Sequence, residues 1–279
     1  MVFDCHVHMR GQRTDTPDNS TELLRKMKLA GVDGGMIYSN EPLSFHNELA
    51  QPGDAKCRLE EVMAYTRNHD NLHPLFWIDP LEPDAAEQVA MAAEAGVEGF
   101  KVICCHHYPQ DERVMPIWQL IANTGKPIMF HSGILYNNSP SANYNRPGNF
   151  EHLFYVKGLR FAMAHISWPW CDEMIAVFGK WNSLSAEKHI AGLADLYVDV
   201  TPGTPPIYRR DALTKLFTVG YEKLPEHVMF GTDASCIYDH QKYARIIARD
   251  NEIYDELGLS AQTRDQVFSG NMLRFLGVH

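Results

Sequence analysis

A regular alternation of short apolar runs with helical patterns is the feature that most constrains the fold of this 279-residue chain. Several of the apolar runs are uninterrupted, which is typical of parallel strands that are covered on both faces. Strands are expected at residues 2–8, 32–38, 72–78, 99–104, 127–131, 160–165, 196–200 and 227–232. Helices are expected at residues 21–29, 54–69, 83–95, 114–123, 186–193, 212–219, 240–254 and 261–276.

The length suits either about two average domains or one barrel of eight strands and eight helices. Alternation from one end of the chain to the other favours the barrel, and no linker or low-complexity tract divides the sequence. We therefore expect an α/β fold, a single (β/α)8 TIM barrel that occupies residues 1–279 as one domain. The alternative is an open Rossmann-like sheet, which the lack of a G-x-G-x-x-G motif after any strand weakens.

The charge balance restricts the partners. Lys and Arg number 25 and Asp and Glu number 35, which gives a net charge of −10. A chain of this sign is not attracted to nucleic acid or to an anionic membrane, so a small-molecule substrate is expected, with a homo-oligomer possible. The sequence shows no signal-peptide pattern, no membrane-spanning run and no C-x-x-C pair among its six cysteines, so we expect a cytoplasmic protein.

The first strand carries the sharpest local signal, the triplet His6-Val7-His8. Residues two apart in a strand point to the same face, so both imidazoles can reach one divalent metal. The alternative interpretation is two partly exposed polar positions at a strand end.

Other strands end in polar residues at equivalent places. Lys101 lies in the fourth strand, His131 ends the fifth, His165 ends the sixth and Asp233 follows the eighth. Burying such groups is costly unless they are paired or bind a metal, and the carboxyl ends of barrel strands build the active site. Because these polar residues recur at the ends of successive predicted strands, we expect them to form one polar site.

In these motifs the chain resembles the amidohydrolase superfamily of metal-dependent barrels, and most closely its compact amidohydrolase-related branch. The resemblance runs from His6 to the closing segment 270–275. It implies one or two divalent ions per chain, with zinc expected and manganese, iron or cobalt possible. It also implies that His6, His8 and Asp233 bind a first metal.

The resemblance leaves the roles of three further residues open. In one-metal members of the superfamily, the residue at the position of His131 completes the site and the one at the position of His165 acts as acid or base. In two-metal members, the lysine at the position of Lys101 is carbamylated and bridges the ions, and both histidines bind the second metal. An unmodified Lys101 that binds an anionic substrate or pairs with Asp233 is the further alternative.

The resemblance implies a metal-dependent hydrolase that uses a metal-activated water to cleave an amide, ester or lactone. Asp233 and His165 are the expected catalytic residues, with Asp233 taking the proton of the water. A non-oxidative decarboxylase on the same scaffold and a non-catalytic metal-binding barrel are the competing hypotheses.

Substrate-binding candidates follow several strands. Arg10 after the His-x-His triplet and Asn40 after the second strand are similar to the carboxylate-binding pair of dihydroorotases, which suggests a small polar substrate bearing a carboxylate. His106, Tyr144 and Arg146 lie in the loops after strands four and five and are further candidates. Solvent-exposed loop positions are the alternative for each of them.

Overall fold

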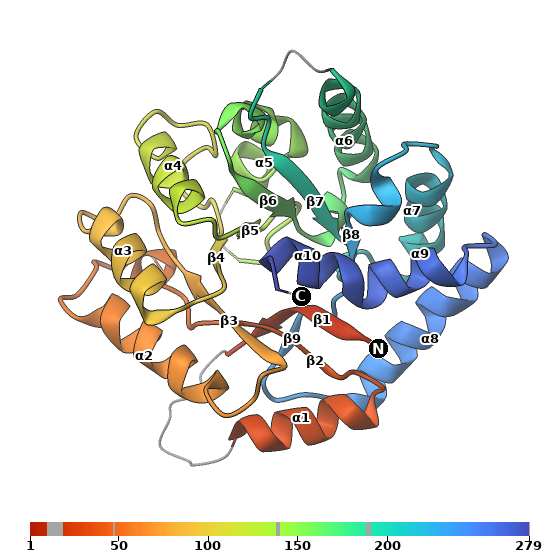
Figure 1. The fold of residues 1–279 in the computed structure, drawn as a ribbon, viewed down its shortest axis with the longest axis horizontal. Coiled ribbons are helices and arrows are strands. Elements are labelled where there is room, and N and C mark those ends of the chain that lie inside the picture. Colours follow the sequence, from red (N-terminus) through yellow and green to blue (C-terminus); the bar gives the residue numbers. More distant parts are fainter. Residues whose placement is uncertain (10–18, 47, 138–139, 188–190, 279) are drawn as a thin grey trace.

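The structure, a computed structural model, describes residues 1–9, 19–46, 48–137, 140–187 and 191–278. It confirms the α/β barrel: parallel strands form a central sheet that curls on itself, with helices outside it (Figure 1). The strands are β1 (Phe3–His8), β2 (Gly34–Tyr38), β3 (Leu72–Trp77), β4 (Gly99–Val102), β5 (Ile128–Phe130), β6 (Arg160–Met163), β7 (Asp195–Asp199), β8 (Val228–Met229) and β9 (Ala234–Ser235).

The barrel is closed by the segment that contains β8 and β9. The strand order is β8-β7-β6-β5-β4-β3-β2-β1-β9, so this one segment pairs with β7 through β8 and with β1 through β9. Between them, the backbone N–H of Cys5 on β1 donates to the carbonyl of Phe230 at 3.0 Å. The expected eighth strand is therefore split into two short ladders, and Asp233 lies in the interruption.

Helices cover the outside of the ring and one of its ends. They are α1 (Asn19–Leu29), α2 (Asp54–Thr66), α3 (Ala85–Ala95), α4 (Met115–Asn123), α5 (Ser141–Tyr144), α6 (Cys171–Ala186), α7 (Pro206–Thr218), α8 (His240–Glu256), α9 (Ala261–Asp265) and α10 (Asn271–Leu276). Within the described ranges, no helix is both long and apolar enough to span a membrane.

Apolar side chains form two cores, one between helices and sheet and one inside the barrel. The inner core includes Phe3 and Met229, and α10 adds Met272 and Phe275 to it. Asn271 donates to the carbonyl of Val228 at 2.7 Å, which ties α10 to the start of β8. The C-terminal helix thus fills the amino end of the barrel, as its place across the centre of Figure 1 shows, and leaves the carboxyl end for the site.

Several helix expectations were wrong in their limits, and α7 begins at Pro206 rather than at residue 212. The helix after β6 is α6, Cys171–Ala186, and not 186–193, where the described residues 187 and 191–193 are not helical. Met174, Phe178 and Trp181 bury one side of α6 against the core, at spacings typical of a helix, so packing decides its position. The expected helix at 261–276 is interrupted, because a π-helical turn at Gln266–Gly270 separates α9 from α10.

Candidate metal centre

Polar side chains from five parts of the barrel line one cavity of about 440 Å³. His6 and His8 come from β1, Lys101 from β4, His131 and His165 from the residues after β5 and β6, and Asp233 from the gap between β8 and β9. All but Asp233 are more than nine-tenths buried. The structure therefore brings together all six residues that the sequence analysis singled out as candidate metal ligands.

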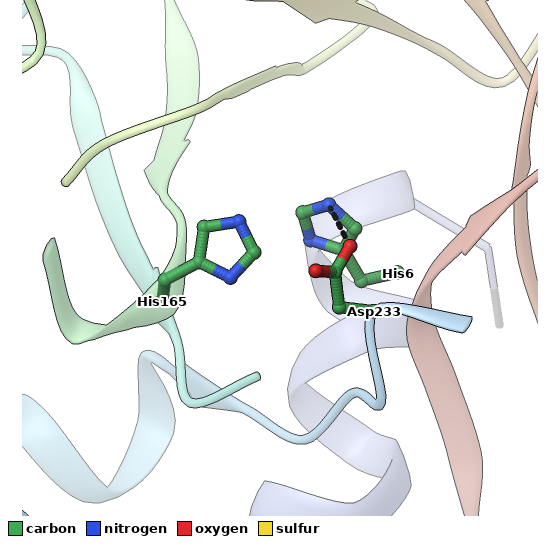
Figure 2. Close-up of side chains that lie close together, drawn as sticks. All are labelled: His6, His165 and Asp233. Atoms are coloured by element: carbon green, nitrogen blue, oxygen red, sulfur yellow. Dashed lines mark ion pairs between the residues drawn. The ribbon is translucent and has the colours of Figure 1, made fainter. Parts of the chain in front are cut away.

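Three of these residues form the centre of the cluster, as Figure 2 shows. His6, His165 and Asp233 each offer one ligand atom, and these atoms all lie within 4.8 Å of one another. A carboxylate oxygen of Asp233 lies 3.7 Å from Nε2 of His6 and 3.4 Å from Nε2 of His8. A nitrogen and oxygen donor set of this kind suits a divalent transition metal.

His131 adds a buried donor to the cluster. Its Nε2 has no hydrogen-bond partner among the described residues, and its ring centroid lies 4.9 Å from that of His165. A buried polar atom left without a partner is costly, and a metal ion at this place would satisfy it. The residues present therefore fit a bound divalent metal.

The protonation states agree with this fit. Burial lowers the pKa of His6 well below its usual value, and the nearby Lys101 lowers it further. Burial, with His165 and Lys101 beside it, lowers the pKa of His131 in the same way. Both imidazoles are thus neutral at pH 7, and neutral imidazole is the form that binds metals.

Asp233 is ionised in this environment. Desolvation in the site would raise its pKa, but its hydrogen bond with His8 and its electrostatic interactions with His165 and His6 outweigh this effect and lower the pKa below its usual range. Its backbone is in the left-handed region, with φ of 55°. The chain therefore bends at Asp233 instead of continuing as an extended strand, and the carboxylate lies beside the two histidines of β1.

His165 also lies on unusual backbone. His165, Ile166 and Ser167 all have positive φ, at 62°, 47° and 53°. Such values cost non-glycine residues about 1–3 kcal/mol each, and they cluster at functional sites in proteins. The turn they form directs the chain away from β6 at the point where the imidazole of His165 enters the cavity.

Asp199, at the end of β7, orients two of the histidines and was missed by the sequence analysis. Its fully buried carboxylate accepts a 2.8 Å hydrogen bond from Nδ1 of His6 and a 2.7 Å bond from the backbone N–H of His165. It also accepts from the hydroxyl of Thr201. The only signal in the sequence was an Asp inside an otherwise apolar strand.

Thr201 connects Asp199 to His165 through hydrogen bonds and so orients the imidazole of His165. The hydroxyl oxygen of Thr201 lies 2.6 Å from Nδ1 of His165. Because the single hydroxyl proton is donated to Asp199, the oxygen must accept from an Nδ1–H of His165. In His6 and His165 alike, Nδ1 carries the proton and Nε2 is unprotonated, which is the form in which an imidazole nitrogen binds a metal.

Lys101 reaches the cluster from β4. Its amine is fully buried, 3.4 Å from Nε2 of His6 and 5.1 Å from the centre of the Tyr38 ring. This distance allows Lys101 to act on the cluster as a cation or, if carbamylated, as a ligand.

Four of the five proposed substrate-binding residues lie elsewhere. Arg10 lies outside the described residues. Asn40 donates to Glu61 at 2.9 Å, and His106 and Arg146 form ion pairs with Asp79 at 3.0 Å and Glu173 at 2.6 Å. Tyr144 packs on Tyr108 with ring centroids 5.0 Å apart. In the part of the chain that the structure describes, none of these four borders the cavity.

Other side chains form the cavity wall. Phe45, Trp77 and Trp168 supply aromatic surface, Ile134, Leu135 and Tyr136 come from the loop after β5, and Glu41 follows Asn40. The cavity therefore combines a polar floor with largely apolar sides, which is typical of small-molecule sites.

Comparisons with known proteins agree with this architecture. The family model described as Amidohydrolase matches residues 3–278. No curated protein matches the sequence.

Solved structures share the fold at low sequence identity. An uncharacterized TIM-barrel protein from Bordetella bronchiseptica has a TM-score of 0.71 at 15% identity, over 99% of this chain and 98% of its own. A proposed 2-pyrone-4,6-dicarboxylic acid hydrolase from Pseudomonas putida has a TM-score of 0.62 at 18% identity, over 99% and 97%. An amidohydrolase from Bifidobacterium longum subsp. infantis has a TM-score of 0.59 at 12% identity, over 100% and 99%.

The family match covers nearly the whole chain, and the histidines and aspartate at the strand ends lie where the resemblance placed a metal site. This chain belongs to the amidohydrolase family.

Proposed function

We propose that this protein is a metal-dependent hydrolase that cleaves an amide, ester or lactone bond in a small polar substrate. The observation that carries the proposal is the cluster of His6, His165 and Asp233, in which buried hydrogen bonds at Nδ1 leave Nε2 of both histidines unprotonated. Family membership and the similarity to a proposed dicarboxylic acid hydrolase support it.

The donor atoms favour one ion per chain. Within the described residues, the ligand atoms that lie close together form a single group, to which His8 and His131 are adjacent. We infer that His6, His8, His165 and Asp233 hold this ion, with His131 beside it, and that Lys101 remains an amine. Zinc is the ion we expect, since imidazole and carboxylate ligands suit it well.

A bound divalent ion supplies Lewis acidity, which lowers the pKa of water to about 7 and polarises a carbonyl group. Asp233 is ionised and faces the cavity, so its carboxylate can take a proton from the attacking water and return it to the leaving group. Buried Lys101 lies where it can donate to the carbonyl oxygen as negative charge develops on it.

The apolar sides of the cavity orient the substrate. Trp77 and Trp168 exclude water from the space above the cluster, which strengthens the electrostatic interactions of the site. All six cysteines are free, and we propose that the protein works in the reducing cytoplasm.

The test is a panel of small lactones, esters and amides of carboxylic acids, assayed with the purified, metal-loaded protein in water enriched in ¹⁸O. Hydrolysis incorporates the label into the acid product, and Asp233→Asn should abolish turnover. Release of CO₂ from an unlabelled carboxylate substrate, without solvent oxygen in the product, would instead identify a decarboxylase. If the protein binds no metal after loading, both the hydrolase and the decarboxylase hypotheses are wrong.

A further inference from the structure

A second cavity, of about 490 Å³, adjoins the metal cluster. It shares Tyr136, Gly203 and Asp233 with the first cavity, so the two are continuous at the edge of the cluster. Its walls are the proline-rich loop after β7 and one side of α8. None of the residues on the side of α8 has a role in the proposed chemistry.

The α8 side of this cavity is cationic. Lys242, Arg245 and Arg249 all line it, and their spacing of three and four residues places them on one face of the helix. Among the ion pairs of the described residues, none involves any of the three. Three cations on one face are unexpected in a chain with a net charge of −10.

The nearby carboxylates are already engaged. Asp250, which follows Arg249, accepts two hydrogen bonds from the guanidinium of Arg209, at 3.0 and 2.6 Å, and both side chains are buried. Asp239 caps the amino end of α8 by accepting from the backbone N–H of Lys242. Asp233 belongs to the metal cluster. The face formed by Lys242, Arg245 and Arg249 is therefore positive.

The opposite wall offers a polar group without a partner. Thr204 lines the same cavity and is 3% exposed, and its Oγ1 has no hydrogen-bond partner among the described residues. A buried hydroxyl is costly in this state unless something in the cavity satisfies it. A hydroxyl that lines the same cavity as three cations is suited to donate to an anion held by those cations.

We propose that this cavity, lined by Thr204, Lys242, Arg245 and Arg249, is an anion subsite that holds a carboxylate or phosphate group of the molecule whose reacting bond lies at the metal cluster. Arg side chains bind both groups through paired hydrogen bonds. The inference rests on the proposed function for the identity of the bound molecule, but the subsite itself does not need the metal. It narrows the substrate class to anionic esters, lactones or amides.

The experiment is isothermal titration calorimetry at low ionic strength with inorganic phosphate and, separately, succinate, on protein freed of metal by dialysis. We expect one of the two probes to bind with millimolar or tighter affinity, and the tighter one identifies the class of anion. The double variant Arg245→Gln/Arg249→Gln should weaken binding at least tenfold, and Thr204→Val several-fold. Equal thermal unfolding midpoints would show that the variants remain folded.

Two controls separate the subsite from other effects. Arg67→Gln removes an exposed charge at the end of α2, away from the cavity, and should leave binding unchanged. Asp233→Asn disables the metal cluster and removes a negative charge from the cavity, so anion binding should persist or tighten even if the hydrolase proposal fails. Wild-type protein that binds neither probe, or a double variant that binds as tightly as wild type, would overturn the subsite.

Discussion

The carboxylate of Asp199 accepts a 2.8 Å hydrogen bond from Nδ1 of His6, and both side chains are buried. The two residues are 193 positions apart in the sequence, on strands β1 and β7, which flank the segment that closes the barrel. This bond settles which nitrogen of His6 is protonated, and it leaves Nε2 facing Asp233.

Asp199→Asn should weaken metal binding by about 10–100-fold, because an amide can no longer accept all the hydrogen bonds that hold His6 and Thr201. The measurement is a competitive titration with a chromophoric zinc chelator. Asp195→Asn is the matched control, since Asp195 lies on the same strand and pairs with His227 at 3.1 Å without lining the cavity. Equal losses in both variants would contradict the positioning role of Asp199.

Metal loading should reach one equivalent per chain, and intact mass should show no carbamate on Lys101. Elemental analysis of the purified protein measures the first and mass spectrometry at near-neutral pH the second. Two equivalents together with a carbamate would replace the one-metal proposal by the two-metal arrangement.

Removal of the metal should destabilise the fold. A ligand at 100 times its Kd stabilises the native state by about 2.7 kcal/mol. In a barrel of this size such a loss corresponds to a drop in the unfolding midpoint of roughly 5–10 °C. Differential scanning calorimetry before and after dialysis against a chelator measures the drop, and added zinc should reverse it. His227→Gln, outside the cavity, should leave the size of this shift unchanged.

The ion pair between His106 and Asp79 should make stability depend on pH. The hydrogen bond with Asp79 raises the pKa of His106 from about 6.5 to about 10, with a further contribution from Cys105. Since the folded pKa is the higher one, the stabilisation is complete below about pH 6.5 and is lost as the pH rises towards 10. His106 is 37% exposed, so solvent screening keeps the contribution to about 1 kcal/mol or less.

Urea unfolding of wild type and His106→Gln between pH 6 and pH 10 measures this effect. The stability advantage of wild type should be largest at pH 6 and should shrink towards pH 10. An advantage that stays constant over this range would contradict the ion pair.

Gly203→Ala should disturb the metal cluster. A Cβ atom at Gly203 would lie 2.9 Å from Cβ of His165 and 3.2 Å from its Cγ, so the loop after β7 or the imidazole must shift. We expect metal affinity to fall several-fold with little change in the far-UV circular dichroism. Gly148→Ala is the control, because its Cβ would meet only the end of the Glu173 side chain, at 3.2 Å. If the Gly203→Ala variant binds metal as tightly as wild type does, metal binding does not depend on the close packing of this loop on His165.

Local pattern in the sequence determined much of this protein. The alternation of apolar runs and helical patterns determined the barrel, because strand and helix periodicities are properties of neighbouring residues. The same pattern placed His6 and His8 on one face of a strand and put His131, His165 and Asp233 at strand ends. In a barrel such ends meet on one side, so the cluster followed from local pattern and topology together.

The tertiary structure decided what depends on contacts between distant residues. Asp199 and Thr201 orient His6 and His165, which belong to other parts of the sequence, and no local pattern marks such partners. The loops after the strands decide which side chains face the cavity, and they left Asn40 and Arg146 paired with other residues. Loop conformation has no periodicity from which to predict it. Packing likewise placed α6 earlier in the chain than its propensity suggested, because burial of Phe178 and Trp181 outweighs local preference.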